Sequence, residues 1–201
     1  MNLFVIADAI TWSALMLALV AAAVLSILAS VRPRRSFVWF ATGSLGAALL
    51  AAASAHGPAP IGVAPLVVVL GLAVAVFGGS AAAGTALDLA MGGAVSPGLH
   101  GGIIVTDRRV DADLASGVHA VERRREVLRG GLTIGVLERV ASAGAIIAGF
   151  PEALAIVVAI KGVGRFTELE APEARERFII GTFASLIWAC AAALVVHFAI
   201  R

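Results

Sequence analysis

Long apolar segments alternate with short polar ones along most of this chain of 201 residues. A helix needs about 20 apolar residues to cross the roughly 30 Å of hydrocarbon in a bilayer. Six apolar runs lie at residues 10–31, 37–55, 60–82, 132–150, 152–164 and 178–200. All but the fifth are long enough to cross. The pattern predicts an all-α polytopic membrane protein with about six membrane segments, built as a single integral membrane domain over residues 1–201.

The fifth run is too short to be an ordinary crossing. Gly149 and Pro151 end the helix before it, and polar residues follow soon after Lys161. The run offers about 13 to 16 residues, or roughly 20 to 24 Å of helix. Two interpretations are open: a short span shielded by its neighbours, or a re-entrant half-helix, which must be surrounded by protein or line a wet cavity.

Basic residues predict how the segments are oriented. They follow the first run, fill the loop at about 93–130, and flank the gap before the sixth run: Arg32, Arg34, Arg35, Arg108, Arg109, Arg123, Arg124, Arg125, Arg129, Lys161, Arg165, Arg175 and Arg177. Six crossings place all of them inside, as the positive-inside rule requires. The expected topology has both termini outside and a cytoplasmic loop at about 93–130, in a bacterial inner membrane.

Two details concern that loop. The third run continues beyond residue 82 as far as Asp88, so Asp88 is expected in a helical overhang on the cytoplasmic side. The charged stretch at 110–129 carries apolar residues at helical spacing, which predicts a surface helix.

Composition supports the membrane location and disfavours several functions. The chain is 60% hydrophobic and 14% charged, and its fifteen Lys and Arg are interspersed among thirteen Asp and Glu. No basic tail exists, so nucleic-acid binding is not expected. Cys190 is the single cysteine and no His pair has metal-ligand spacing, so no disulfide, metal or cofactor is expected. Hydrolase motifs are missing too, which makes an enzyme the less favoured interpretation.

Glu138 and Arg139 stand side by side inside the fourth run. Adjacent residues on a helix lie about 100° apart and cannot face the same partner. One face of this helix is expected to carry small residues around Glu138, with Arg139 off that face: Gly131, Gly135, Glu138, Ser142, Ala145 and Gly149. A similar small face on the last helix contains Gly181 and Ser185.

A charge inside a membrane segment needs a partner or water. Lys161 lies near the same boundary as Glu138 and is the expected partner, so the adjacent charges would serve two different neighbours. The predicted polar cluster lies in the inner leaflet and comprises Glu138, Arg139, Lys161, Arg165 and Arg177, with Glu168 and Glu170 at its rim.

The segments that carry this cluster resemble a known family. The motifs "RGGLTIGVLERV", "ALAIVVAIKGVGRFTEL" and "ERFIIGTFASL", within about residues 130–188, are similar to the C-terminal region of the bacterial membrane-protein family called domain of unknown function 3307. Gly162 stands where that family usually has Ser. The resemblance implies that the polar residues belong together and brings no known activity.

These features favour a non-catalytic membrane protein that binds an anionic lipid headgroup or a membrane partner protein at the cluster. The small-residue faces also predict homo-oligomers. A structural ion pair that only fixes helix register is an alternative for Glu138 and Lys161. A second alternative is a small transporter or channel that uses these two residues, and a third is a membrane enzyme acting on a lipid phosphate.

Overall fold

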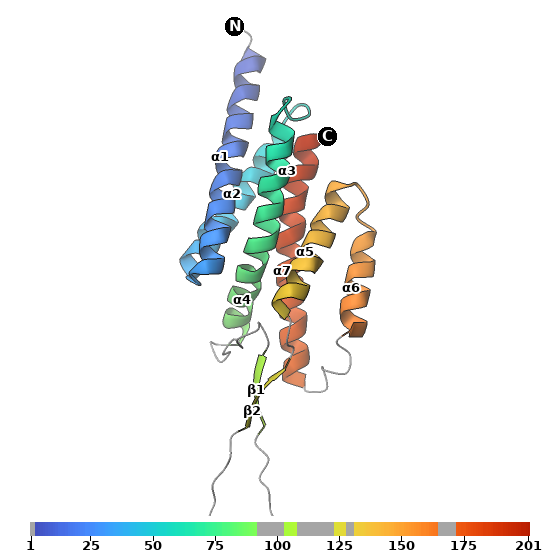
Figure 1. The fold of residues 1–201 in the computed structure, drawn as a ribbon. Helices are drawn as coiled ribbons and strands as arrows, with labels where there is room; N and C mark the ends of the chain where they lie inside the picture. Colours follow the sequence, from blue (N-terminus) through green and yellow to red (C-terminus); the bar gives the residue numbers. More distant parts are fainter. Residues whose placement is uncertain (1–2, 92–102, 108–122, 128–130, 165–171) are drawn as a thin grey trace, which may run out of the picture.

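The computed structural model of the chain describes residues 3–91, 103–107, 123–127, 131–164 and 172–201. Long helices run up and down beside one another, and both chain termini lie at the same end of the bundle (Figure 1). Helix α1 (Leu3–Val31) and helix α2 (Arg35–Ser54) form an antiparallel pair. We call the end that holds the termini the terminal end, and the opposite end the hairpin end.

The third long helix contains an irregular turn. It consists of α3 (Val63–Ala73), a π-helical segment η1 (Val74–Gly78) and α4 (Gly79–Ala90), which follow one another without a break. A π-turn accommodates one extra residue and changes the direction in which later side chains point. Helix α4 continues beyond the apolar run, as predicted, so Asp88 lies in its last turn. There Asp88 pairs with Arg35 of α2 at 3.7 Å.

The last three helices are α5 (Gly131–Ile147), α6 (Ala153–Gly164) and α7 (Pro172–Ile200). Helix α5 ends where Gly149 adopts a left-handed backbone with φ of 79°, which glycine tolerates without strain. The Leu154 amide then donates to the Pro151 carbonyl at 3.0 Å as α6 begins. The predicted break at Gly149 and Pro151 is therefore confirmed.

Helix α7 lies at the centre of the bundle, and helices α2, α3, α4 and α5 all pack against it. Its buried residues are mostly small, including Ala189, Ala192 and Ala193. Small residues let helices approach closely in a membrane protein. One close approach is at Gly71, where an added Cβ would overlap a methyl group of Val196. Helix α6 differs, because none of its residues is buried and it packs chiefly against α5.

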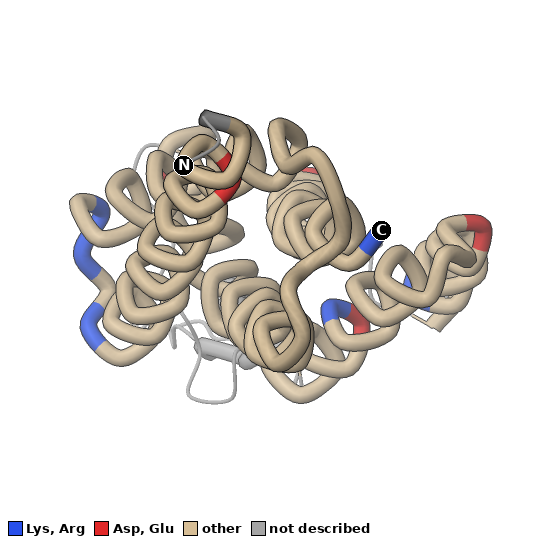
Figure 2. The backbone as a smooth tube through the Cα atoms, turned by 90° about the horizontal axis from the view of Figure 1, so that it is seen from above, with Lys and Arg blue, Asp and Glu red and all other residues tan. Residues whose placement is uncertain are grey.

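Four helices of the described chain are long and apolar enough to cross a membrane: Phe4–Val31, Arg35–Ser54, Val63–Ala90 and Ala174–Ile200. Seen from above, charged residues occupy only short stretches of the backbone (Figure 2). Helix α6 is the rightmost helix in this view. The fold is that of an α-helical membrane protein. The two remaining apolar runs form shorter helices than the sequence predicts, because α5 has 17 residues and α6 has 12.

A short antiparallel ribbon lies beyond the helices at the hairpin end (Figure 1). Strand β1 (Ile103–Asp107) pairs with strand β2 (Arg123–Val127), with Ile103 opposite Val127. The expectation of a surface helix is wrong for residues 123–127. The β-branched run in β1 favours a strand and offers a partner for pairing. The rest of the loop at 93–130 lies outside the described residues.

Candidate functional site

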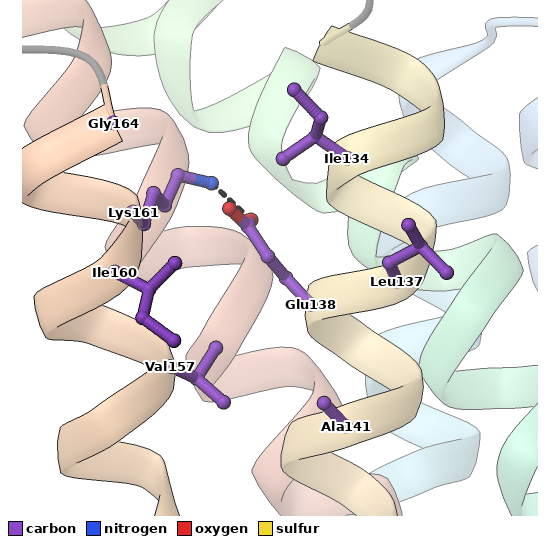
Figure 3. Close-up of a pocket in the computed structure, with 8 residues that line it drawn as sticks. All are labelled: Ile134, Leu137, Glu138, Ala141, Val157, Ile160, Lys161 and Gly164. Carbon is purple, nitrogen blue, oxygen red and sulfur yellow. Dashed lines mark hydrogen bonds and ion pairs between the residues drawn. The ribbon is translucent and has the colours of Figure 1, made fainter.

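Glu138 of α5 and Lys161 of α6 form an ion pair, with Lys161 Nζ donating to Glu138 Oε2. Their side chains point toward one another across the space between the two helices (Figure 3). Both are largely shielded, with side-chain exposures of 11% for Glu138 and 17% for Lys161. The Lys161 ammonium also lies 5.6 Å from the ring centre of Phe178 on α7, within the range of a cation–π interaction.

A groove of about 400 Å³ runs between α5 and α6 beside this pair. Apart from the pair and Gly164, its lining is apolar: Ile134, Leu137, Ala141, Val157 and Ile160. Figure 3 shows Val157 and Ala141 on the side of the pair away from Gly164. Since no residue of α6 is buried, the groove opens outward from the bundle. Its chemistry is that of an apolar slot with one acid–base pair near one end.

Glu138 and Arg177 each have one buried polar atom that lacks a hydrogen-bond partner among the described residues. Glu138 Oε1 is buried and unpaired, although its sister oxygen accepts from Lys161. Arg177 Nε is also buried and unpaired, on the residue that precedes Phe178. Buried polar groups usually have partners, so these atoms are places where a ligand or water would gain hydrogen bonds.

Arg139 points to a different part of the bundle. The residue is only 4% exposed, and its Nη1 donates to Ser185 Oγ of α7 at 3.1 Å. The aliphatic part of the side chain lies over Gly79 of α4. The guanidinium then runs beside Gly135, where an added Cβ would be 3.0 Å from Nη1. Glu138 and Arg139 thus serve α6 and α7 respectively, which is the division that their spacing predicts.

The sequence predicts Glu138 on the packed face of α5 and Arg139 off that face, but in the structure Arg139 lies on the buried face. That face comprises Arg139, Ser142, Ala143 and Ile146, whereas Glu138 lies at its edge. The reason is local: Gly79 and Gly135 leave room for a long side chain that hydrophobic patterning alone would place outside. Gly135 therefore makes space for Arg139 rather than for another helix.

The other predicted packing residues lie in varied surroundings. Ser142 is fully buried, and Gly131 is half-buried. An added Cβ at Gly181 would make an ordinary 3.5 Å contact with Leu87 of α4. Gly149 is exposed in the turn after α5, close to the Arg201 guanidinium. Only some of these residues therefore act as contacts between helices.

A second buried contact escaped the sequence analysis. Trp188 of α7 donates its indole N–H to the Val74 carbonyl in the π-helical segment at 3.0 Å. Its ring occupies the place where a side chain at residue 78 would be, since a Cβ on Gly78 would overlap it. The adjacent glycines Gly78 and Gly79 therefore receive Trp188 and Arg139. The sequence signal for both contacts is this pair of adjacent glycines.

Three members of the predicted cluster, Arg165, Glu168 and Glu170, lie outside the described residues. No protein-family model matches the chain, and neither do the curated proteins or the solved structures with which it was compared. The resemblance to the family called domain of unknown function 3307 stays a prediction.

Proposed function

We propose that the protein is a non-catalytic membrane protein that binds an anionic lipid in the groove between α5 and α6. The observation that carries this proposal is the Glu138–Lys161 pair, which stands near one end of an otherwise apolar groove. Ionisable residues inside membrane segments are costly and commonly mark sites for ligands or ions. A purely structural pair would not need an open apolar slot beside it.

The groove suits an acyl chain better than a water-soluble solute. A site for a polar solute normally presents several polar groups that fix its orientation. Here Leu137, Val157 and Ile160 offer only hydrocarbon. The exposed position of α6 means that a chain would enter sideways from the bilayer without crossing the bundle.

The headgroup would contact Lys161 and Arg177. An ammonium group has three hydrogen-bond donors, and Glu138 occupies one of them. Arg177 on α7 is the residue before Phe178, whose ring lies near the Lys161 ammonium. The buried Nε of Arg177 has no hydrogen-bond partner among the described residues. Lys161 near one end of an apolar groove, with Arg177 next in sequence to Phe178, favours a lipid phosphate at that end.

We infer that the hairpin end faces the cytoplasm of a bacterial inner membrane. Arg35 and Asp88 pair at the start of α2 and the end of α4, so the basic turn at 32–34 lies at this end. Lys161 and Arg177 belong to the parts of α6 and α7 nearest the same end. Among the described residues, Arg201 is the only Lys or Arg at the terminal end. The positive-inside rule then places both termini outside.

The same orientation supports six crossings, with α6 as a short span. His197 Nδ1 donates to the Ile146 carbonyl at 3.0 Å, and Gly149 lies beside Arg201. The turn between α5 and α6 is therefore level with the last turn of α7, which ends a full crossing. Helix α6 starts from this level with 12 residues, or about 18 Å of helix. A bilayer adapts to a short segment by thinning or by snorkelling of flanking residues.

Native mass spectrometry in a mild detergent with added phosphatidylglycerol would test the lipid site. The charge-neutral variant Glu138→Gln/Lys161→Gln removes both charges without leaving either one unpaired. The variant Ile160→Trp fills the groove, and Ile156→Trp is its matched control, because Ile156 is exposed on the same helix and does not line the groove. We expect the wild type and Ile156→Trp to bind one lipid more than the other two variants.

Equal lipid retention by all four proteins would overturn the proposal. A lipid-free species throughout would do so as well, and it would leave Glu138 and Lys161 as a structural link between α5 and α6. The charge-neutral variant needs a thermal-unfolding measurement beside it, so that loss of the adduct is not mistaken for loss of the fold.

Transport of a small solute is the second candidate function. The observation in its favour is that Glu138 pairs with Lys161 of the short helix α6, while the neighbouring Arg139 donates to Ser185 of α7. Short helices facing intramembrane charges occur at ion and solute sites of transporters. Flux into proteoliposomes that changes when Glu138 and Lys161 are neutralised is the expected result for a transporter. Tight vesicles across a broad solute panel would exclude it.

The native mass spectra of the wild-type protein would also report its oligomeric state. The small residues that predict self-association are largely used inside the bundle, since Ser185 accepts from Arg139 and Ser142 is fully buried. A homo-oligomer would need another surface. We propose the exposed apolar side of α1, which includes Val5, Ile10 and Leu17.

A further inference from the structure

A second groove lies between α2 and α4, on a different part of the bundle from the α5–α6 groove. Its volume is about 190 Å³. Trp188 of α7 is buried and lines it from behind these two helices. The remaining lining residues come from α2 and α4: Val38, Trp39, Thr42, Ala82, Thr85, Ala86 and Leu89.

The walls of this groove present hydrocarbon. Thr42 donates its hydroxyl to the Val38 carbonyl of its own helix at 2.8 Å, and Thr85 does the same to the Ala81 carbonyl at 2.9 Å. The Trp188 indole N–H is already bonded to the Val74 carbonyl. The hydroxyls of Thr42 and Thr85 and the indole N–H of Trp188 are thus satisfied within the protein, and the groove offers methyl groups and the rings of Trp39 and Trp188.

One end of the groove is positively charged. Arg35 is one turn before Val38 and Trp39 on α2, and Asp88 is one turn after Thr85 on α4, so their ion pair lies just beyond the lining residues. Arg32 and Arg34 lie exposed in the adjoining turn. Three arginines against one aspartate leave this end with a net positive charge among the described residues.

We propose that this groove is a second lipid site, which takes one acyl chain of an anionic phospholipid against Trp188 and its phosphate at Arg35. The site stands on other helices and other charges than the α5–α6 groove, so it does not depend on the function proposed there. Charge complementarity favours an anionic occupant: the cationic group of a zwitterionic headgroup offsets the attraction of its phosphate to the arginines, whereas an anionic headgroup keeps a net negative charge.

The ion pair with Asp88 leaves Arg35 able to bind. Its atoms are 3.7 Å apart, and the Arg35 and Asp88 side chains are 56% and 41% exposed, so solvent screens the attraction strongly. A guanidinium has five N–H donors in a planar fork that matches phosphate as well as carboxylate. Asp88 therefore holds Arg35 over the end of the groove without using all its donors.

Fluorescence quenching by brominated lipids would test the proposal. The Trp12→Phe/Trp39→Phe protein keeps Trp188 as its only tryptophan, and Phe at residue 39 keeps an aromatic ring in the groove wall. In nanodiscs of phosphatidylcholine, a small fraction of lipid is replaced by brominated phosphatidylglycerol or by brominated phosphatidylcholine. We expect the anionic bromolipid to quench Trp188 more strongly. Arg35→Gln should lower this preference about five-fold, since one basic residue near a membrane surface contributes about that factor.

Two further variants make the result decisive. Ala86→Leu narrows the groove and should reduce quenching by both bromolipids. Arg201→Gln removes a charge at the opposite end of the bundle and should change neither. Equal quenching by the two bromolipids in the single-tryptophan protein, or a preference that survives Arg35→Gln, would overturn the anionic site. Quenching that is unchanged by Ala86→Leu would overturn the groove as the place where the chain lies.

Discussion

Arg139 lies so closely over Gly79 that a Cβ atom at residue 79 would overlap Arg139 Cδ and come within 3.3 Å of the Ser185 carbonyl oxygen. Three helices therefore meet at one glycine: α4 supplies the gap, α5 the long side chain and α7 the hydrogen-bond acceptor for it. The contact explains how a guanidinium is held inside an apolar bundle.

Replacing Gly79 by Ala should therefore destabilise the protein. Alanine normally favours a helix over glycine by about 0.5 to 1 kcal/mol, but overlap in a packed interior costs about 1 to 3 kcal/mol. Gly84→Ala is the matched control on the same helix, because nothing lies within 4 Å of a Cβ there. Thermal unfolding in detergent should show a lower Tm for Gly79→Ala and an equal or higher Tm for Gly84→Ala. Equal Tm changes in the two variants would contradict the contact.

The ion pair between α5 and α6 should survive an exchange of its charges. Glu138→Lys alone and Lys161→Glu alone each leave two like charges facing one another. Both should lower stability. The double variant restores an opposite-charge pair, and a coupling of about 1 to 3 kcal/mol is expected from a double-mutant cycle. Additive effects of the two substitutions on unfolding would show that the residues do not interact.

Loss of the Trp188 hydrogen bond should be costly. Trp188→Phe keeps most of the ring but leaves the Val74 carbonyl without this donor, and an unpaired buried polar group costs about 1 to 3 kcal/mol. Trp39→Phe is the control, because Trp39 is exposed and its indole makes no hydrogen bond to the described residues. Unfolding measurements should separate the two variants clearly. A Trp39→Phe protein that is the less stable of the two would rule out this role for Trp188.

Chemical labelling should decide whether the turn between α5 and α6 reaches the outer surface. In a Cys190→Ser background, Phe150→Cys is expected to react with a membrane-impermeant maleimide added outside. Ile61→Cys, in the turn before α3, serves as the positive control, and Arg34→Cys should react only after permeabilisation. A re-entrant α6 predicts that Phe150→Cys stays unlabelled while Ile61→Cys reacts.

The long helices were predictable because each contains an uninterrupted apolar run, and the end of α5 because Gly149 and Pro151 stop a helix. The Glu138–Lys161 contact was predictable for an electrostatic reason. A carboxylate inside the membrane needs a cation at its own depth, and few cations are available there. The short length of α5 was not predictable, since apolar residues continue beyond Ile147 into the turn.

The surroundings of Arg139 were harder to predict. Small residues occur on more than one side of α5, so patterning alone cannot tell which side meets α7. The π-turn at Val74–Gly78 has no sequence signal beyond its glycine pair, yet it decides which glycines face Trp188 and Arg139. Contacts of this kind depend on three helices at once and follow only from their arrangement in space.

The contacts on either side of the π-turn also fix the number of residues between Gly71 and Gly79 in the third helix. On the two sides of this turn, Gly71 receives Val196 and Gly79 receives Arg139. Deleting one residue between them would rotate one half of the helix by about 100° against the other. One of the two glycines would then turn away, and a larger residue would face α7 or Arg139 in its place. Small substitutions are tolerable in this stretch away from its packed glycines, whereas deletions and insertions are not.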